Sequence, residues 1–513
     1  MQTETISIQD YEAADQPYFE RLYREWFSAH FGVAPEPVDE RVLRQPGKMI
    51  LEKNGAILML VCDSGPAGFV ALKKADSYSY ELTKMAIQEE FRGRGWGEAL
   101  CRAAIDKARG LGAKRIILYS HSSLQTALRL YRKLGFVETP LEPGPYSSFR
   151  CDIKMEQWID RAHSRIHEVD WDNLELGSHT SDHMLVCDYS GGQWKTPEIQ
   201  PFGPFSLSPA TLALHYGQTI FEGMKAFRTE DGRIHIFRPD RHYERLMRSV
   251  ERMCMPAPPA SVFHDGLRRL VALDQDWVPG GEGTALYLRP MMIATDTKLA
   301  VKVSDSYRYA VICLPAGPYF ARPLRVKVEQ KYVRAVRGGT GYAKCGGNYG
   351  GALYPTQQAR AEGYDQVLWT DGLHHRHIEE MGMMNVFFVI DGALVTPPLT
   401  DSILDGITRD SLLILALNAG LTVEERPVSV EELREGLERR RVEEVFGAGT
   451  AAVVAPIGSI GIDGIDYPLP VVGARGEGGA HRESDSIALF LKNELDAIRY
   501  GRKPDPYGWN SYI

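Results

Sequence analysis

One lysine in the second half of the 513-residue chain is framed by two glycine-rich turns. Residues 338–341 precede Lys344, and residues 346–350 follow it. Glycines let the backbone pass close to a bulky planar ligand, because they have no side chain to obstruct it. A surface lysine serves solubility, whereas a lysine framed in this way has an amine placed for Schiff-base formation. We therefore expect Schiff-base chemistry at Lys344.

Two adjacent carboxylates downstream could supply a charge to the same ligand. Glu379 and Glu380 lie just before an apolar run at residues 386–390 that predicts a buried strand. A carboxylate at the mouth of a buried strand is costly unless it is paired, and a cationic cofactor would pair it. Neighbouring side chains on extended backbone point to opposite sides, so only one of the two can face a bound ring. For Glu379 the alternative is an exposed charge.

A second glycine-rich loop stands in the first part of the chain, between a strand end at residues 85–87 and a helical pattern at residues 99–111. Backbone N–H groups of such a loop converge on an anion, which the positive end of the helix dipole also attracts. A diphosphate would fit there, and a plain strand-to-helix turn is the alternative. The loop consists of Arg92, Gly93, Arg94, Gly95, Trp96 and Gly97.

The elements that position these groups must form more than one domain, because single hydrophobic cores stop growing at roughly 250 to 300 residues. Short strand-like runs alternate with helical periods in the first part, which predicts an α/β domain over residues 1–155. A charged stretch follows, and we predict a linker at residues 156–178. The rest is rich in Gly and Pro, with several β-like runs. Within it, the glycine-rich residues 472–482 predict a mobile surface loop.

Composition and charge favour small molecules as partners. Lys plus Arg number 59 and Asp plus Glu 67, so the net charge of −8 gives no basic field for nucleic acid or an anionic membrane. No run of about 18 apolar residues predicts a membrane span, and the N-terminus lacks the pattern of an export signal. The seven cysteines are scattered and never spaced C-x-x-C, which argues against a disulfide framework and a zinc site. We expect a cytoplasmic protein without a metal.

The first domain resembles a known family when the order of its elements is considered. After the glycine-rich loop come a helix, a further strand and a second helix with the sequence ALRLYRKLGF at residues 127–136. This order and this pattern resemble the GNAT family of acetyl-CoA-dependent N-acetyltransferases over residues 3–153. The resemblance implies that the loop holds the coenzyme A pyrophosphate and that backbone near Ile87 aligns the acetyl thioester. It also implies that Tyr131 protonates the departing thiolate.

Several features of the first domain have more than one interpretation. Tyr131 could instead pack with Leu128 and Leu134 on the buried side of its helix. An asparagine that many family members carry before that helix is absent, and the acceptor amine cannot be identified. Glu81 or Glu89 could act as the base, although a carboxylate near a strand end is usually only solvated. The domain could also be a non-catalytic acetyl-CoA sensor.

The remainder of the chain, from about His167 to the end, closely resembles the branched-chain amino acid aminotransferases. The segments that carry the resemblance are residues 214–227, 237–239, 287–290, 338–350, 378–385, 396–399, 406–409 and 505–509. It implies an α+β, two-lobed fold of the type IV pyridoxal-phosphate (PLP) scaffold, with a small lobe at residues 179–316 and a large lobe at residues 317–513. The implied reaction exchanges the amino group of L-leucine, isoleucine or valine with 2-oxoglutarate, giving glutamate, in a homodimer or higher homo-oligomer. D-amino acid transamination and aminodeoxychorismate lysis are the alternatives.

The same resemblance assigns roles to the residues around the lysine. Lys344 would bind the cofactor through its amine and then move the proton at the substrate Cα. Glu380 would keep the pyridine nitrogen protonated, and Tyr349 would hydrogen-bond the phenolate oxygen. Side-chain or backbone groups of four residues would hold the phosphate: Arg245, Ile407, Thr408 and Thr450.

A substrate pocket is also implied by the resemblance. Tyr216 and the backbone N–H of Ala451 would receive the substrate carboxylate. Arg289 would meet the γ-carboxylate of glutamate, and a structural strand arginine is the alternative. Three aromatic side chains would form an apolar wall for an aliphatic side chain: Phe221, Tyr287 and Tyr349.

Three positions depart from the family pattern or allow another interpretation. Arg245 could belong to a solvated basic stripe with neighbouring arginines at helical spacing, Arg241 and Arg248. Met383 replaces a threonine hydroxyl that commonly helps the substrate end of the site, so it removes a donor and adds bulk. His242 stands where asparagine is common before the phosphate arginine.

A cysteine pair that some relatives use as a redox switch is also missing. Ala452 and Ala455 occupy the two positions of that C-x-x-C motif. We therefore expect no thiol switch at this site.

Overall fold

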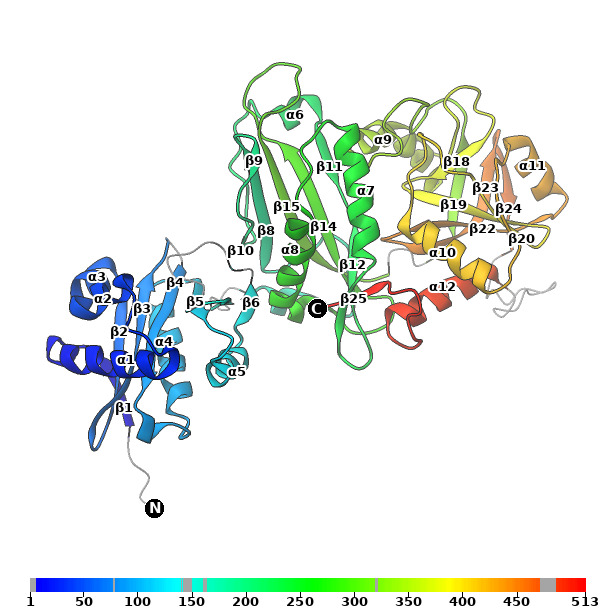
Figure 1. The fold of residues 1–513 in the computed structure, drawn as a ribbon. Helices are drawn as coiled ribbons and strands as arrows, with labels where there is room; N and C mark the ends of the chain where they lie inside the picture. The colour runs from blue at the N-terminus through cyan, green and yellow to red at the C-terminus, as the bar shows by residue number, and fades with distance from the viewer. Residues whose placement is uncertain are drawn as a thin grey trace. The chain divides into compact units, whose positions relative to one another are not determined.

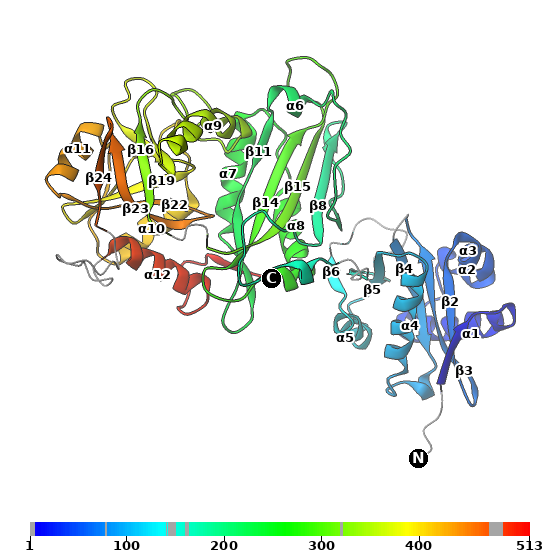
Figure 2. The same cartoon turned by 180° about the vertical axis from the view of Figure 1, so that it is seen from behind.

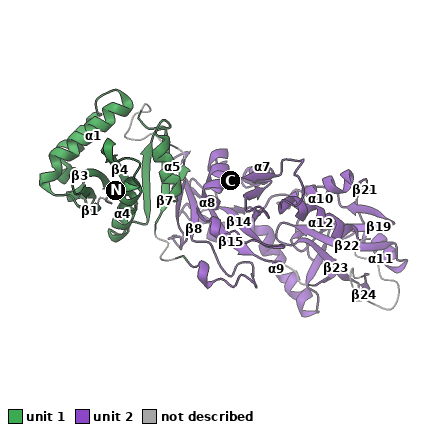
Figure 3. Cartoon of the chain, turned by 90° about the horizontal axis from the view of Figure 1, so that it is seen from below, with its two compact units in different colours: residues 1–164 green, residues 165–513 purple. Residues whose placement is uncertain are grey.

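The computed structural model describes residues 6–76, 79–139, 141, 150–159, 164–318, 322–470 and 486–513. It divides into two compact units, Met1–Ser164 (unit 1) and Arg165–Ile513 (unit 2), shown in Figure 3. Each unit builds its own sheets and its own hydrophobic cores. The surface loop predicted at residues 472–482 lies outside the described residues.

Unit 1 is built on one seven-stranded sheet of order β1-β2-β3-β4-β5-β7-β6. Its strands are β1 Ile6–Asp10, β2 Ala56–Cys62, β3 Gly65–Lys74, β4 Ser79–Ile87, β5 Arg115–Ser120, β6 Val137–Thr139 and β7 Ile153–Trp158. Its helices are α1 Gln16–Phe31, α2 Pro37–Arg44, α3 Pro46–Met49, α4 Trp96–Gly110 and α5 Gln125–Lys133. Figures 1 and 2, seen from opposite sides, show α1 and α4 on opposite faces of this sheet.

Both faces of the unit 1 sheet are apolar because helices cover both. Along β2, Ile57 and Met59 pack on the α1 side, whereas Leu58 and Leu60 pack on the α4 side. Successive side chains of a strand point to opposite faces, so a strand covered on both sides has a continuous apolar sequence. This explains the run from residue 56 to residue 62.

β4 and β5 run parallel but stay together only at their beginnings. They pair over residues 79–81 and 115–117, while the rest of β4 pairs with β3. The register of β3 and β4 shifts beside Val70, and Lys84 there has a φ of 53°. An extra residue of this kind is a β-bulge, which bends a strand and redirects a side chain. The later parts of β4 and β5 therefore flank an opening in the sheet.

The predicted end of the first domain at residue 155 falls inside β7. Glu156 and Gln157 pair with Ile117 and Ile116 of the interior strand β5. The domain therefore includes the whole of β7, and residues 156–158 of the predicted linker belong to the sheet. The linker was predicted from its charged sequence. Glu156 is one of those charged residues, but it is buried and lies 3.0 Å from the Lys154 amine, so a charge at this position does not mark a linker.

Unit 2 contains two nine-stranded sheets, and the first has the order β10-β8-β15-β14-β12-β13-β25. β9 pairs with β8, and β11 pairs with β14. The strands are β8 His183–Ser190, β9 Gln193–Trp194, β10 Glu198–Pro201, β11 Thr219–Phe221, β12 Met224–Arg228, β13 Ile234–Phe237, β14 Ala285–Ala294, β15 Tyr307–Ala316 and β25 Asn510–Tyr512. The helices in this part are α6 Leu212–Tyr216, α7 Pro239–Arg252 and α8 Ala260–Leu273.

The second sheet of unit 2 has the order β18-β17-β16-β23-β22-β19-β20-β21, with β24 paired to β23. Its strands are β16 Leu324–Glu329, β17 Gln366–Thr370, β18 Ile378–Met381, β19 Met384–Ile390, β20 Ala393–Thr396, β21 Val423–Glu425, β22 Val442–Gly449, β23 Val453–Ile462 and β24 Ile465–Pro468. The helices are α9 Gly346–Ala361, α10 Ile407–Asn418, α11 Val430–Glu438 and α12 Ile487–Arg499. In both views α7 and α9 lie between the two sheets (Figures 1 and 2).

The end of the chain crosses the lobe boundary predicted from the sequence. β25 lies within residues 317–513, yet it pairs with β13 of the first sheet through Asn510, Ser511 and Tyr512. The second lobe therefore does not contain the whole C-terminal segment. Among the described residues, no helix has the length and apolar character to span a membrane.

Candidate active sites

A cavity of about 170 Å³ in unit 2, called the lysine cavity, gathers most of the side chains predicted for the aminotransferase site. Its walls come from both sheets and from the N-terminal end of α10. The predicted residues that line it are Phe221, Arg245, Tyr287, Arg289, Lys344, Tyr349, Glu380, Met383, Ile407, Thr408, Thr450 and Ala451. These residues are far apart in the sequence, and the two sheets with α7, α9 and α10 bring them together.

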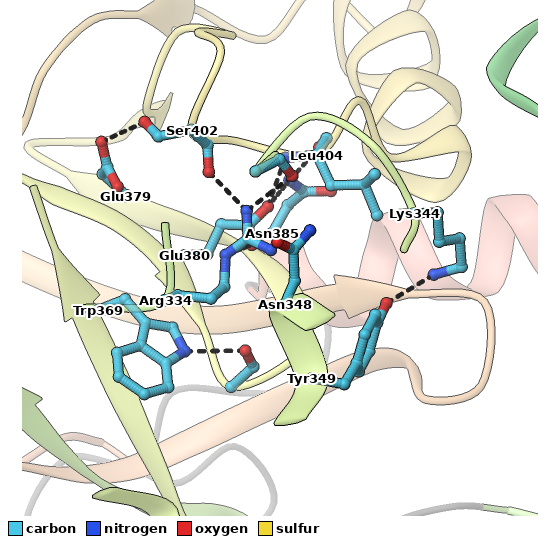
Figure 4. A network of polar contacts seen from close by, with 12 residues as sticks. Arg334, Lys344, Asn348, Tyr349, Trp369, Glu379, Glu380, Asn385, Ser402 and Leu404 are labelled. Atoms are coloured by element: carbon cyan, nitrogen blue, oxygen red, sulfur yellow. Dashed lines mark hydrogen bonds and ion pairs between the residues drawn. The ribbon is translucent and has the colours of Figure 1, made fainter. Parts of the chain in front are cut away.

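Lys344 is held by backbone contacts just before α9. Its carbonyl accepts the N–H of Phe221 at 3.0 Å, and its own N–H donates to Ser249 Oγ at 2.9 Å. The amine donates to the Tyr349 hydroxyl at 2.9 Å (Figure 4). The Nζ atom also lies 4.9 Å from the centre of the Phe221 ring. The lysine amine is thus fixed in front of an aromatic wall.

Glu380 is a buried carboxylate on β18 whose two oxygens have separate partners. Oε1 accepts the Leu404 N–H at 2.8 Å, and Oε2 lies 2.6 Å from the Arg334 Nε (Figure 4). Burial raises the pKa of Glu380, and the Arg334 charge opposes that rise. Glu379 is not among the lining residues; it is half-buried and accepts the Ser402 hydroxyl at 2.6 Å, so it is not an exposed charge. Of these two neighbours only Glu380 faces the cavity.

The N-terminus of α10 forms an anion site in the wall of the lysine cavity. Ile407 and Thr408 are its first residues, and N–H groups in a first turn have no partner within the helix. The helix dipole favours negative charge at the same point. The preceding Gly406 has no room for a side chain, because a Cβ there would lie 1.9 Å from Asn385 Oδ1. Gly406, Ile407 and Thr408 all line the cavity, so the first turn of α10 is available to an anion there.

Arg245 on α7 is held by a buried carboxylate and does not belong to a solvated stripe. Its Nε and Nη2 both donate to Glu222 at 2.8 Å, and Nη1 donates to the Asp405 carbonyl oxygen at 3.0 Å. His242 shares the same carboxylate through Nδ1 at 2.8 Å. Although burial acts to raise it, Arg245 and His242 hold the pKa of Glu222 well below its usual range. Burial lowers the pKa of His242 to about 4, so this ring is neutral at pH 7.

The donor set of the lysine cavity fits PLP in charge and shape. The buried Glu380 matches a protonated pyridine nitrogen, and the helix N-terminus with Arg245 matches a phosphate dianion. Lys344 supplies the amine for the aldehyde, with Tyr349 beside it. These are the residues that would hold the cofactor.

At the substrate end, one guanidinium stands beside aromatic rings. Arg289 Nη2 donates to the Tyr287 hydroxyl at 3.0 Å, and its guanidinium carbon lies 4.8 Å from the centre of the Phe221 ring. Gly223 permits the close packing here, because a Cβ there would lie 2.0 Å from the Tyr287 hydroxyl oxygen. Met383 also lines the cavity and is 57% exposed. The substrate end is therefore an apolar wall that holds one cation, Arg289.

Tyr216, predicted to receive the substrate carboxylate, does not line the lysine cavity. It is the last residue of α6 and is 44% exposed, and α6 stops there because Gly217 takes a φ of 64°. The Leu212 N–H donates to the Asp296 carbonyl oxygen at 2.8 Å, which fixes α6 beside the connection between β14 and β15. A single chain thus leaves the Tyr216 ring on its outer surface.

Two charged residues of the site were not identified from the sequence. Lys225 is buried on β12, and its amine donates to the carbonyl oxygen of Ala451 at 3.0 Å. Burial and the nearby Arg499 lower the pKa of Lys225 to about 7. Arg334, the partner of Glu380, also donates to backbone carbonyls, including that of Ser402 at 2.5 Å. Lys225 lies within residues 214–227, one of the segments that carry the aminotransferase resemblance, so its position could have identified it as a candidate site residue.

A larger cavity of about 710 Å³ lies in unit 1 between the diverging parts of β4 and β5, and we call it the β4–β5 cavity. Ile87, the loop glycines and Tyr131 line it, as does Arg92, whose Nε donates to the Ile87 carbonyl oxygen at 3.2 Å. Gly93 and Gly95 have φ values of 79° and 82°, which favour glycine. The predicted loop therefore opens into a cavity rather than forming a plain turn.

Two predicted loop residues do not line the β4–β5 cavity. The Arg94 guanidinium lies 5.3 Å from the ring centres of both Phe91 and Trp96. Trp96 is buried and stacks on Phe91 with ring centres 5.1 Å apart. Arg94 and Trp96 therefore pack outside the cavity. The part of the loop that faces the cavity consists of Arg92 and the glycine backbone.

Tyr131 lines the β4–β5 cavity, where an acid would have to lie, and it also packs against the core that contains Leu128 and Leu134. Leu128 and Leu134 are buried, whereas Tyr131 is half-buried and lines the cavity. Burial raises the pKa of Tyr131, so the phenol keeps its proton at neutral pH. Neither candidate base lines the cavity: Glu81 is buried 3.6 Å from the Lys73 amine, and Glu89 is exposed.

Comparisons with known proteins agree with both resemblances. The class IV aminotransferase family matches residues 219–460, and the GNAT acetyltransferase family matches residues 16–136. The branched-chain-amino-acid transaminase 1 of Bacillus subtilis is 42% identical over 342 residues, which cover 66% of this chain and 93% of the relative.

Solved structures of aminotransferases are also similar to this chain. The branched-chain aminotransferase of Thermoproteus uzoniensis with norvaline has a TM-score of 0.52 at 25% identity, covering 64% of this chain and 99% of that one. The T.th. branched-chain amino acid aminotransferase complexed with N-(5'-phosphopyridoxyl)-L-glutamate has the same TM-score and identity, covering 66% and 99%. The expected type IV fold with PLP is confirmed. Its second unit makes this chain a member of the branched-chain amino acid aminotransferase family, and its first unit carries a GNAT-family domain.

Proposed function

We propose that the chain transfers the amino group of L-leucine, L-isoleucine or L-valine to 2-oxoglutarate. One observation carries this proposal: the Lys344 amine, the Glu380 carboxylate and the N-terminus of α10 open into one cavity. The name of the Bacillus subtilis relative supports the substrate class. D-amino acid transamination and aminodeoxychorismate lysis are not favoured, because both Bacillus subtilis relatives of about this similarity are named as branched-chain enzymes.

The residues of the lysine cavity divide the work of proton transfer and orientation. When bound, PLP supplies the electron sink that a carbanion at Cα needs. Lys344 Nζ takes the proton from Cα and later returns it, while Tyr349, 2.9 Å away, holds the amine in place. Glu380 holds a proton at the pyridine nitrogen, because Arg334 at 2.6 Å favours its ionised form.

Two kinds of side chain must enter the same pocket during one catalytic cycle. Phe221 and Tyr287 offer an apolar wall to leucine, isoleucine or valine. The guanidinium of Arg289 would turn to the γ-carboxylate of glutamate, and an aliphatic side chain would leave its bond to Tyr287 in place. The Arg289 guanidinium therefore has a hydrogen-bond partner in both complexes, which avoids the cost of an unpaired buried cation.

A homodimer would complete the lysine cavity. Apolar side chains stand exposed on α6 and on the connection between β14 and β15, which lie together at one end of the first sheet (Figure 1). The exposed side chains are Leu214, Tyr216, Leu299, Val301 and Val303. An apolar patch of this kind marks a protein interface. A second copy packed there would bury the patch and bring its Tyr216 toward the substrate.

Unit 1 would transfer an acetyl group from acetyl-CoA to an amine. The glycine-rich loop and Tyr131 open into one cavity, which favours catalysis over a sensor role. We also place the protein in the cytoplasm, because all seven cysteines are unpaired, as is usual in a reducing compartment.

The aminotransferase proposal is tested with purified protein, single amino acids and 2-oxoglutarate, with glutamate measured as product. Lys344→Ala should lower the rate on leucine on the order of 10³-fold or more and prevent covalent attachment of PLP after borohydride reduction, measured by mass spectrometry. The control is Lys331→Ala, because the Lys331 side chain lies outside the cavity. Lys225→Met would not serve as a control, since Lys225 contacts the site. Leucine turnover by Lys344→Ala at the parental rate would contradict the assignment.

A further inference from the structure

One group of residues that line the β4–β5 cavity consists of aromatic rings and two cations, and Lys84 and Arg150 both contact Tyr23 of this group. α1 contributes the rings, β4 contributes one cation, and the segment that leads into β7 contributes the other. The side chains of this group are Tyr23, Trp26, His30, Phe31, Lys84 and Arg150. We call this group the acceptor end, because the loop and Ile87 account for the coenzyme.

The two cations of the acceptor end are paired with carboxylates that lie behind the cavity wall. The Lys84 amine is 2.5 Å from Asp39 Oδ1, and Arg150 Nη1 donates to Asp39 Oδ2 at 2.8 Å and to Glu36 at 3.3 Å. Asp39 is fully buried, and neither it nor Glu36 is among the lining residues. The basic member of each pair therefore lines the cavity, whereas its carboxylate does not.

The bulge in β4 is what places Lys84 at the acceptor end. In a regular strand, Leu82 and Lys84 would share one face of the sheet. Leu82 belongs to the core on the α4 side, whereas the Lys84 amine lies 5.3 Å from the centre of the Tyr23 ring on the α1 side. A left-handed φ at a lysine costs free energy, and such strain is concentrated at functional sites. The strand is thus deformed to bring a cation to the cavity.

Negative charge is scarce on the cavity wall. Among the described residues that line the cavity, Glu98 is the one acidic side chain. It belongs to the first turn of α4, beside the glycine-rich loop. It is already bonded to Lys133 at 2.6 Å and to Arg102 at 2.9 Å. A polyamine or an aminoglycoside would bring several positive charges to Lys84 and Arg150 without a lining acid to neutralise them.

We propose that the acceptor of unit 1 is an amine that carries a carboxylate, an amino acid, and that Lys84 and Arg150 bind this carboxylate. The proposal rests on the acetyltransferase function proposed for unit 1. The carboxylate would receive charge-assisted hydrogen bonds, while Trp26 and Phe31 would pack against the side chain. Positive charge nearby also favours the neutral form of the acceptor amine, which is the nucleophile.

The transfer step balances with the groups present. The amine nitrogen attacks the acetyl carbonyl carbon, a C–N bond forms, and the C–S bond to coenzyme A breaks. Tyr131 gives its proton to the leaving thiolate, and the proton lost by the amine nitrogen restores the phenol through solvent. The products are the N-acetyl amino acid and free coenzyme A.

The test compares amines with and without the carboxylate on the full-length protein. Initial rates are measured by mass spectrometry of the acetylated product, without a 2-oxo acid, for leucine against 3-methylbutylamine and phenylalanine against phenethylamine, with spermidine as the polycation. We expect a kcat/KM roughly 30-fold higher for the carboxylate-bearing member of each pair, as for one lost charge-assisted hydrogen bond. Equal values for the pairs, or the highest value for spermidine, would overturn the acceptor class and leave the acetyltransferase function standing.

A matched pair of variants assigns the effect to the acceptor end. Arg150→Gln should reduce the ratio of kcat/KM for leucine to that for 3-methylbutylamine to within about 3-fold. The KM for acetyl-CoA, assigned to the glycine-rich loop, should stay close to that of the parent. Arg44→Gln, an exposed arginine paired with Glu40 at 3.5 Å, should keep the full preference. Thermal unfolding and the KM for acetyl-CoA of the same sample report whether unit 1 is folded, and its transaminase rate serves as the concentration reference. An unchanged preference in folded Arg150→Gln would overturn the role of that residue.

A final outcome concerns unit 1 as a whole. Binding of acetyl-CoA with no transfer to any amine of the panel would contradict the acetyltransferase function, and the acceptor class with it. This result differs from transfer without carboxylate preference, so failure of the function and failure of the inference are distinguishable.

Discussion

The two cavities hold their charges in different ways. In the lysine cavity, the buried ionised residues are bound on several sides, as Glu380 is by Arg334 and Leu404, and Arg245 by Glu222. In the β4–β5 cavity, Lys84 and Arg150 both face one end, with their carboxylates behind them. The first arrangement suits a ligand of fixed shape and charge. The arrangement in the β4–β5 cavity offers two positive charges to acceptors whose side chains can differ.

The size of the cavities agrees with this difference. The lysine cavity has about 170 Å³, whereas the β4–β5 cavity has about 710 Å³. A close-packed site discriminates through contacts that cannot move, while a roomy one discriminates mainly through charge. Variants at the lysine cavity should therefore have all-or-none effects, and variants at the β4–β5 cavity should change preference.

The largest expected effect in this comparison comes from removing one fixed charge. Glu380→Gln should lower transamination roughly 10²- to 10³-fold, because a neutral amide cannot stabilise a protonated pyridine nitrogen. Acetyl transfer should not change, since the β4–β5 cavity is built from unit 1 residues alone. Steady-state rates of both reactions on one preparation measure this.

The adjacent residue provides the control for that charge. Glu379→Gln removes an equal charge one position away, but Glu379 faces Ser402 and does not line the cavity. It should cost less than about 5-fold in rate, because the glutamine oxygen can still accept the Ser402 hydroxyl and the side chain lies outside the cavity. Equal losses for the two variants would show that Glu380 acts through folding and not through the cofactor.

A smaller effect is expected from the acid of the β4–β5 cavity. Tyr131→Phe should lower kcat for acetyl transfer about 10²-fold, because the thiolate would leave without a proton donor. The KM for acetyl-CoA should change little, and Tyr119→Phe, a second tyrosine lining the same cavity, should stay within about 3-fold of the parent. Full activity in Tyr131→Phe would exclude it as the acid.

Much of the lysine cavity could be predicted because its groups lie in short, ordered segments. Lys344 between two glycine turns, Glu380 before a buried strand and Gly406 before α10 are each set by local backbone requirements. Such requirements leave a readable pattern in the sequence. The fold class of both units followed from the same segments and is confirmed by the family matches.

What could not be predicted depends on contacts between distant segments. Arg334 and Glu380 are 46 positions apart and meet because β18 and the segment before Lys344 converge, which no local pattern encodes. The acceptor end depends on a bulge at Lys84 that pairs it with Asp39 of α2. The role predicted for Tyr216 stays a prediction, since a single chain leaves this side chain exposed and a second copy would be needed to bring it to the substrate.

Crowding around the anion site gives the third prediction. Gly406→Ala should destabilise unit 2 by about 3 kcal/mol and weaken PLP binding, because the new Cβ would displace the Asn385 amide 1.9 Å away. Gly351→Ala is the control, since α9 has open space there and alanine favours a helix. Thermal unfolding and cofactor titration should separate the two. A fully stable Gly406→Ala would show that this part of the cavity is not rigid.

The smallest expected effect is a pH dependence of the unfolding free energy that arises from the buried His242 beside the lysine cavity. His242 titrates at about 4 in the folded chain but near its ordinary 6.5 when unfolded, because burial disfavours the cation. The unfolded chain therefore binds more protons in that window, so unfolding free energy should fall by about 2 kcal/mol from about pH 7 to about pH 5. His242→Asn keeps a hydrogen-bond donor for Glu222 without this titration, and its melting temperature should depend less on pH. An equal pH dependence in both proteins would mean that the loss arises elsewhere and that His242 is already protonated beside Glu222.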